Sequence, residues 1–153
     1  MKKYIAFVLL MITVFTVYAR KDEAKEDSIR KRIDSKSFVF IAQSALPMKG
    51  KFISLSSSYD VKVAQDTVVA YLPYFGEAHT AIFSSDESGI KFTSTNNRYE
   101  VKQKKNGWDI VIKPKDVGNN VELHFNISKS GSTMLRVNDY RRDPISFRGY
   151  IDY

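Results

Sequence analysis

The chain has 153 residues, of which 43% are hydrophobic and 13% aromatic, which excludes a disordered protein and fits one domain with its own core. The sequence has no cysteine, so disulfide bonds, thiolate metal sites, a cysteine nucleophile and a lipid-modified amino-terminal cysteine are excluded. The formal net charge is +7, but no run interleaves basic and aromatic residues as nucleic-acid grooves do, so no nucleic-acid partner is predicted.

Residues 1–19 have the features of a signal peptide. Two lysines follow the initiator, and residues 4–17 are an apolar run shorter than the about 20 residues that span a bilayer. We predict cleavage between Ala19 and Arg20, export by the general secretory route, and a location in the periplasm or at the cell surface. Removal of the two lysines would lower the net charge from +7 to +5. An uncleaved anchor is the alternative, because basic residues follow the apolar run; the mature chain carries no predicted transmembrane helix.

Residues 20–36 predict one amino-terminal helix. Acidic and basic residues alternate there, and Ile29 and Ile33 are spaced four apart, as on one face of a helix. Because this apolar stripe is narrow, we expect the helix to lie on the surface of the domain formed by residues 37–153.

The first half of that domain predicts strands joined by short turns. A strand is expected over residues 37–46 and another over 51–55, followed by a polar connection of Ser54, Ser56, Ser57 and Ser58 and a strand from Tyr59. Residues 67–72 are β-branched or apolar on both alternating faces, which predicts a central strand buried on two sides.

The second half continues this pattern through several strands with one apolar face. Asn106-Gly107 predicts a tight hairpin, because both residues accept a positive φ. About nine short strands cannot all be covered by one thin helix, so we predict an antiparallel β-sandwich or curled barrel. The residues expected to face inward here are Trp108, Ile110, Ile112, Val121, Leu123, Phe125, Ile127, Leu135, Val137, Ile145, Phe147 and Ile151.

An aromatic hub follows the strand at residues 67–72. Pro73 cannot donate to a ladder and is expected to end the pairing, while Gly76 would permit a backbone turn. The rings of Tyr71, Tyr74 and Phe75 are therefore expected at one rim of the sheet. They either plug the end of the core or contact a ligand or partner there.

Two adjacent arginines precede the last strand and extend the predicted rim. Arg141 and Arg142 could clamp an acidic group through bidentate hydrogen bonds. The alternative is that one of them pairs with Asp139 or Asp143. The candidate ligand or partner rim thus consists of Tyr71, Pro73, Tyr74, Phe75, Arg141 and Arg142.

The sequence carries no pattern typical of an enzyme. His79 and His124 are the only histidines, and Glu77-x-His79 alone does not make a metal site, so no metal and no cofactor are predicted. No nucleophile-elbow glycine pattern, which is typical of serine hydrolases, surrounds a serine. The acidic residues lie on predicted solvent-exposed faces, which does not favour paired carboxylates for glycoside cleavage. An envelope hydrolase would need His79 in a cleft with a carboxylate and a serine. The triplet Asn126-Ile127-Ser128 matches a glycosylation acceptor, and we treat this match as accidental.

Five motifs spread over the mature chain resemble a family of exported Gram-negative bacterial proteins, domain of unknown function 4251. The resemblance implies export and a compact β-rich domain; it implies no activity and no catalytic residue. The motifs are Phe38-x-Phe40 with Pro47 and Gly50, Leu72-Pro73-Tyr74-Phe75-Gly76, Gly89-Ile90-x-Phe92, Trp108-x-Ile110-x-Ile112-x-Pro114, and Arg142-x-Pro144-Ile145-x-Phe147-x-Gly149.

The leading hypothesis from the sequence is a non-enzymatic periplasmic or surface-associated binding module for an apolar or weakly acidic ligand. The alternative is a structural or interaction protein of the cell envelope that pairs with a protein partner through a sheet edge.

Overall fold

A computed structural model describes residues 23–77, 89–118 and 120–152. The predicted signal peptide, its cleavage point between Ala19 and Arg20, and His79 lie outside the described residues. The first described residues, 23–34, form a helix, and residues 35 and 36 turn the chain toward the first strand. Lys36 has a φ of 50°, a left-handed conformation that ends the helix.

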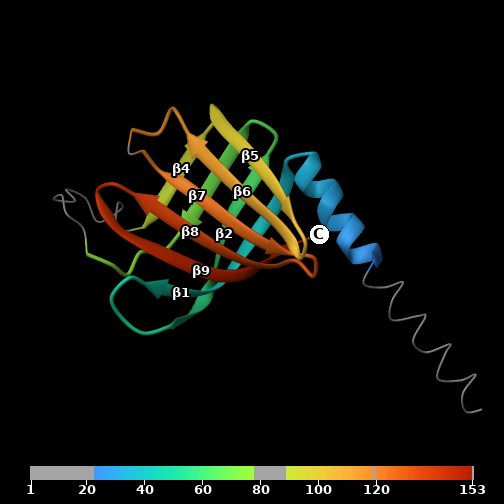
Figure 1. Ribbon diagram of the computed structural model, residues 1–153. Helices are drawn as coiled ribbons and strands as arrows, with labels where there is room; N and C mark the ends of the chain where they lie inside the picture. Colours follow the sequence, from blue (N-terminus) through green and yellow to red (C-terminus); the bar gives the residue numbers. More distant parts are fainter. Residues whose placement is uncertain (1–22, 78–88, 119, 153) are drawn as a thin grey trace, which may run out of the picture.

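Nine strands follow and form one antiparallel sheet with the order β4-β3-β2-β1-β9-β8-β7-β6-β5 (Figure 1). The prediction of a mainly β, curled antiparallel fold with an amino-terminal helix is therefore confirmed. The strands are β1 Ser37–Pro47, β2 Ile53–Ala64, β3 Thr67–Leu72, β4 Ile90–Ser94, β5 Asn97–Lys104, β6 Gly107–Pro114, β7 Glu122–Ser128, β8 Ser132–Asp139 and β9 Arg142–Asp152.

The sheet curls into a half-barrel, so that strands β1–β4 lie behind strands β5–β8 and run across them (Figure 1). The bend lies where β1 and β9, which have 11 residues each, pair with each other. The register of β1 shifts between Ala42 and Ser44 against both β2 and β9, which marks a bulge at Gln43. Because a bulge bends its strand and increases the local twist, it folds one half of the sheet over the other.

Gly149 in β9 allows the two backbones to meet closely at this bend. A Cβ atom at this position would overlap the carbonyl oxygen of Ile41 and lie 2.9 Å from the ring of Phe40. The pairing of β1 with β9 at the bend therefore requires glycine, as expected where another backbone approaches closely.

The edge strands β4 and β5 are joined by Thr95 and Asn96 alone, although they end opposite sides of the sheet. The carboxylate of Asp116 fixes this connection, because it accepts hydrogen bonds from the Ser94 hydroxyl and, at 2.9 Å, from the Thr95 backbone N–H. These hydrogen bonds hold the pKa of Asp116 below its usual value. The side-chain amide of Asn97 binds the Asp66 carbonyl at 2.6 Å and ties the connection to the β2–β3 turn.

The core lies between the two crossing halves and is apolar throughout. The ring of Phe125 in β7 meets Phe38 and Phe40 of β1 edge to face, with centroids 5.7 and 5.9 Å apart. Each fully buried side chain of this size contributes about 1.5–3 kcal/mol, so the contact between the layers depends on this cluster. The inward-facing residues predicted for β6–β9 are all buried, which confirms the alternating pattern.

The helix closes one open end of the half-barrel. Ile29 and Ile33 are fully buried, and Ile29 packs against Gly131 in the β7–β8 turn. The hydroxyl of Tyr99 in β5 donates a hydrogen bond to the Ile33 carbonyl at 3.2 Å, and burial raises the pKa of this tyrosine. The narrow apolar stripe is therefore not a surface feature but part of the core, because the sheet leaves that end uncovered.

Three local expectations are wrong. β2 runs as one strand through the serines that were expected to form a connection, although residues 55–58 have no partner in β1 because they lie opposite the bulge. β3 is next to an edge, and Tyr71 on its outer face is 45% exposed, because its β-branched residues reflect strand propensity and not burial on two sides. The tight hairpin predicted at Asn106-Gly107 is present, since Lys104 pairs with Gly107, but only Gly107 has the expected positive φ, at 150°, and Asn106 has none.

Replacing Gly149 by alanine is expected to destabilise the fold by about 3 kcal/mol or more, because the new Cβ must push the β1 and β9 backbones apart. Urea unfolding followed by circular dichroism measures the difference. Gly118→Ala is the control, since no atom lies within 4 Å of a Cβ there, and it should change stability by less than about 0.5 kcal/mol. Equal stability of the two variants would contradict this role of Gly149.

Candidate functional site

The aromatic hub lies at the end of the half-barrel opposite the helix. Pairing of β3 stops at Leu72, as the proline predicts, and Pro73 is buried. The Tyr74 hydroxyl lies 2.8 Å from the Glu77 carbonyl and 3.0 Å from the Asp143 carbonyl, both of which can accept its hydrogen. Burial raises the pKa of Tyr74, so the phenol keeps this proton in the neutral range.

Arg142 is the second member of this end closure. Its side chain is buried, and its guanidinium lies 5.1 Å from the centre of the Tyr74 ring. Its Nη1 donates a hydrogen bond to the Gly89 carbonyl at 2.9 Å, and its Nε lies 3.6 Å from a carboxylate oxygen of Asp139. Arg142 thus joins the chain before β4 to the β8–β9 turn, and its contacts are those of a structural residue.

The remaining rim residues point elsewhere. Tyr71 stacks on Tyr59 with ring centroids 5.5 Å apart on the outer face of the sheet, and Lys91 lies over its ring. Phe75 is 42% exposed. The Nε of Arg141 lies 3.5 Å from Asp139 without a hydrogen-bond partner. The structure thus brings Tyr74 and Arg142 together, and both arginines face Asp139, as the ion-pair alternative predicts.

Gly76 serves a different purpose from the one expected. Its φ is not in the left-handed region, so it does not supply a special turn conformation. A Cβ atom at this position would overlap the Tyr74 hydroxyl. Gly76 is therefore needed for space, because it lets the tyrosine ring fold back to reach the two carbonyls.

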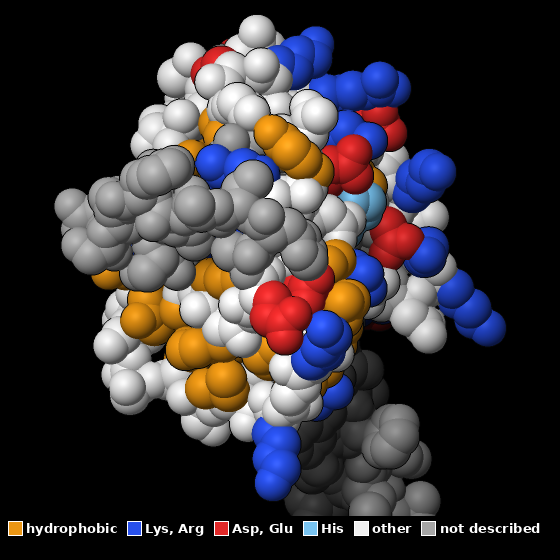
Figure 2. Space-filling view, turned by 90° about the vertical axis from the view of Figure 1, so that its left-hand side faces the viewer, with side chains coloured by type: hydrophobic (Ala, Val, Ile, Leu, Met, Phe, Trp, Pro, Cys, Tyr) orange, Lys and Arg blue, Asp and Glu red, His pale blue; other side chains and the backbone are white. Residues whose placement is uncertain are grey.

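The end of the molecule that carries the hub also carries exposed hydrophobic side chains. Figure 2 shows them gathered on the lower half of the face that includes the β1–β2 connection, with charged side chains at their border. The Lys49 amino group and the Glu77 carboxylate form an exposed ion pair at 3.2 Å across this end. The exposed residues here are Leu46, Met48, Phe52, Phe75 and Tyr140.

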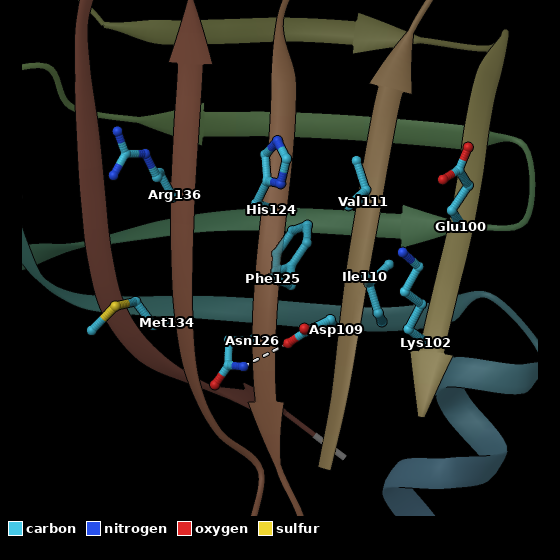
Figure 3. Close-up of a pocket in the computed structure, with 10 residues that line it drawn as sticks. All are labelled: Glu100, Lys102, Asp109, Ile110, Val111, His124, Phe125, Asn126, Met134 and Arg136. Carbon is cyan, nitrogen blue, oxygen red and sulfur yellow. Dashed lines mark hydrogen bonds between the residues drawn. The ribbon is translucent and has the colours of Figure 1, made fainter. Parts of the chain in front are cut away.

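A shallow pocket of about 330 Å³ lies elsewhere, on the outer face of strands β5–β8 (Figure 3). Two rows of directly opposed residues cross these four strands, because the strands pair in antiparallel register. We call this pocket the outer groove. Its first row is Glu100, Val111, His124 and Arg136, and its second row is Lys102, Asp109, Asn126 and Met134.

Every acidic side chain on this part of the outer face has a cationic partner. Glu100 pairs with Arg98 on the same strand, and Asp109 pairs with Lys104. Further along, Lys113 donates to Glu122 at 2.5 Å, and the same carboxylate lies 3.0 Å from His124 Nε2. The acidic charge of the groove is therefore already neutralised by neighbours.

Two of these carboxylates have a lowered pKa. The hydrogen bond from the Lys104 amino group is the main cause for Asp109, and the 2.6 Å bond from the Asn126 amide adds to it. The hydrogen bond from Lys113 is the main cause for Glu122, with His124 second. Both groups therefore stay ionised in the neutral range and do not serve as proton donors there.

Two cations of the groove remain without an ion-pair partner among the described residues. Arg136 uses only its Nε, which donates to Asn138 at 3.2 Å, and its two terminal nitrogens stay free for other acceptors. Lys102 forms no ion pair, although its charge contributes to the low pKa of Asp109. Its amino group points toward the middle of the groove in Figure 3. An anion placed over this face would therefore meet uncompensated positive charge.

Within the described ranges, no cluster of three or more histidine or acidic side chains could hold a metal ion. In the same part of the chain, no helix is long and apolar enough to cross a membrane.

A family model for a domain of unknown function, DUF4251, matches residues 20–151. The chain belongs to this family. A crystal structure of a DUF4251 family protein from Bacteroides eggerthii DSM 20697 is similar, with a TM-score of 0.61 and 12% identity over 84% of this chain and 87% of that one. This likeness concerns the fold alone. No curated protein matches the chain.

Replacing Arg142 by methionine is expected to destabilise the DUF4251 domain by about 3 kcal/mol, because Asp139 and the Gly89 carbonyl lose a buried partner. Thermal and urea unfolding give the difference. The exposed Arg148, which lies over the ring of Phe52, provides the control, and Arg148→Met should cost less than about 1 kcal/mol. If both variants lose the same stability, Arg142 does not hold the end closure together.

Replacing Lys113 by methionine is expected to raise the pKa of Glu122 toward its ordinary value of 4.5, because the main hydrogen bond that lowers it is removed. A lowered carboxylate pKa stabilises the fold above its unfolded value, and this stability is lost as the pH falls through the folded value. The variant should therefore lose stability at neutral pH but not at low pH. Carboxyl NMR titration checks the shift, and Lys115→Met should leave the pKa of Glu122 unchanged.

Proposed function

We propose that the protein is a non-enzymatic binding module, and that the outer groove holds a small ligand with an apolar body and an acidic group. The observation that carries this proposal is the pair of cations, Arg136 and Lys102, that stay without an ion-pair partner on opposite sides of the groove while every acidic side chain there is paired. We infer export to the periplasm or the cell surface from the leader, residues 1–19.

The charge on this face favours an anion. Five cationic and three acidic side chains project from β5–β8 on the outer side, which leaves a net charge of +2 with histidine neutral. A guanidinium with free terminal nitrogens binds a carboxylate through two parallel hydrogen bonds, so Arg136 is the main anchor. The five cationic side chains are those of Arg98, Lys102, Lys104, Lys113 and Arg136, and the three acidic ones are those of Glu100, Asp109 and Glu122.

The floor of the groove suits an apolar ligand body. Met134 is 40% exposed beside the row that contains Val111, and methionine adapts to ligands of different shape. The volume of about 330 Å³ is at the lower end of the range for small-molecule sites. The backbones that carry Lys102 and Arg136 are three strand spacings apart, or roughly 14 Å. A single small carboxylate therefore binds Arg136, and Lys102 attracts the ligand at longer range.

The second candidate is an interaction protein that pairs with an envelope partner through a sheet edge. The sheet order leaves β4 and β5 with one strand neighbour each among the described strands. Lysines at Lys102, Lys104 and Lys105 line the β5 end of the sheet, and lysine on an edge strand opposes added strands. This charge pattern favours the groove over the edge as the binding site.

Titration of the isotope-labelled protein with octanoate tests the proposal. We expect NMR shift changes at Val111, His124, Met134 and Arg136, and weaker changes with the neutral analogue octanol, because the charge of the acid is lost. Arg136→Gln should weaken octanoate binding about tenfold, since a charged hydrogen-bonded anchor contributes about 1.5–3 kcal/mol.

The matched control for this titration is Lys115→Gln, which removes one exposed charge outside the groove and should leave octanoate binding unchanged. Shift changes at Tyr71, Tyr74 and Phe75 would assign the ligand to the aromatic rim instead. Equal binding of octanoate and octanol, or unchanged binding by Arg136→Gln, would contradict an anion site in the groove.

A further inference from the structure

The connection between β1 and β2 exposes large apolar side chains on a projecting hairpin. We call residues 48–52, Met48-Lys49-Gly50-Lys51-Phe52, the β1–β2 tip, and all five are exposed. Met48 is 57% exposed and Phe52 50% exposed, and Leu46 beside them is 38% exposed. In Figure 1 the tip extends beyond the body of the half-barrel.

The exposure of these side chains is not a consequence of an unformed hairpin. The strands below the tip pair in register, with Ala45 opposite Ile53, and Pro47 is buried. Gly50 has a φ of 139°, a conformation that favours glycine and shapes the turn. The guanidinium of Arg148 lies 5.5 Å from the ring centre of Phe52. A formed hairpin thus presents Met48 and Phe52 outward.

Basic side chains alternate with the apolar ones. Neither Lys51 nor Arg148 has an ion-pair partner among the described residues, and the guanidinium of Arg148 lies over the ring of Phe52. Lys49 pairs with Glu77, but both side chains are 69% exposed, so solvent screens the pair. Three cations and one acid therefore surround the apolar side chains, and the tip carries net positive charge.

We propose that the β1–β2 tip docks the protein on a lipid surface that contains anionic headgroups. Met48 and Phe52 enter the boundary between headgroups and acyl chains, while Lys49 and Lys51 extend back to the anionic headgroups. This assignment does not depend on the outer groove, which lies on the face of β5–β8.

A bilayer fits this surface better than a protein partner does. A stable protein interface buries at least about 1,000 Å² and has a packed centre, whereas the tip is narrow and its apolar side chains are separated by lysines. A lipid surface needs neither a pocket nor shape complementarity. Phe75 and Tyr140 are 42% and 67% exposed, and the hydrogen bond from Tyr74 to the Asp143 carbonyl joins the segments that carry them, so they extend the surface that faces the bilayer.

Co-sedimentation with vesicles tests the docking. The purified protein should bind phosphatidylcholine vesicles that contain phosphatidylglycerol and bind pure phosphatidylcholine vesicles more weakly. Phe52→Ser should lower the partition coefficient about tenfold or more, because burial of this ring drives insertion. Met134→Ser is the matched control, since this side chain is 40% exposed but lies in the outer groove, and it should leave partitioning unchanged.

Two further variants separate charge from insertion. Lys51→Gln should weaken binding to the anionic vesicles about fivefold and have no effect on pure phosphatidylcholine, whereas Lys115→Gln should change neither. In Phe52→Trp, the emission of the new indole should shift to the blue on anionic vesicles, while the native Trp108 is already buried.

Three outcomes would overturn the proposal. The wild-type protein stays in solution with both kinds of vesicle, or Met134→Ser loses as much binding as Phe52→Ser, or Phe52→Ser binds as the wild type does. If the protein fails to bind vesicles but Phe52→Ser abolishes a specific cross-link to another protein, the tip is a protein interface and the lipid assignment is wrong. Octanoate titration of Phe52→Ser and Lys51→Gln should be unaffected, which keeps this test separate from that of the groove.

Discussion

The close pairing of β1 with β9 is the contact on which the rest of the structure depends. Each of the two strands belongs to a different half of the sheet, and the bulge at Gln43 together with Gly149 lets one half fold over the other. Without this bend the apolar faces of β1–β4 and β5–β8 would not meet, and Phe125 would have no partner layer. The outer groove lies on the half formed by β5–β8, and the β1–β2 tip extends from the other half.

Much of the fold follows from the alternation of apolar and polar residues. Strands such as β6 and β7 show one buried face, so their inward residues and the curled antiparallel sheet were predictable. The pattern fails where burial and strand propensity separate: the outer face of β3 is apolar because β-branched and aromatic residues suit a sheet, and Tyr71 remains exposed there. It also fails at β2, which continues as one strand through residues 55–58 although these have no partner in β1.

The candidate sites were less accessible to sequence reasoning. The sequence predicted the aromatic hub as a possible ligand rim. The structure does bring two of its residues, Tyr74 and Arg142, into contact. Their polar groups, however, are used by backbone carbonyls and Asp139. The outer groove could not be predicted from the sequence, because its residues come from four strands. Only the strand register places Arg136 opposite His124. In the sequence the groove corresponds only to polar residues at the solvent-facing positions of consecutive strands. Such residues have no distinctive spacing.

The strand order also has a consequence for how the chain folds. β1 is the first strand of the sheet and β9 the last, yet they are neighbours in its middle, so the contact between them closes a loop of about a hundred residues. Such non-local pairing gives the domain a high contact order, and high contact order slows folding. A nascent chain that ends before Arg142 would expose the inner edges of β1 and β8, both suited to mispairing. β9 therefore joins the two halves of the sheet, and the native sheet can form only after β9 has been synthesised.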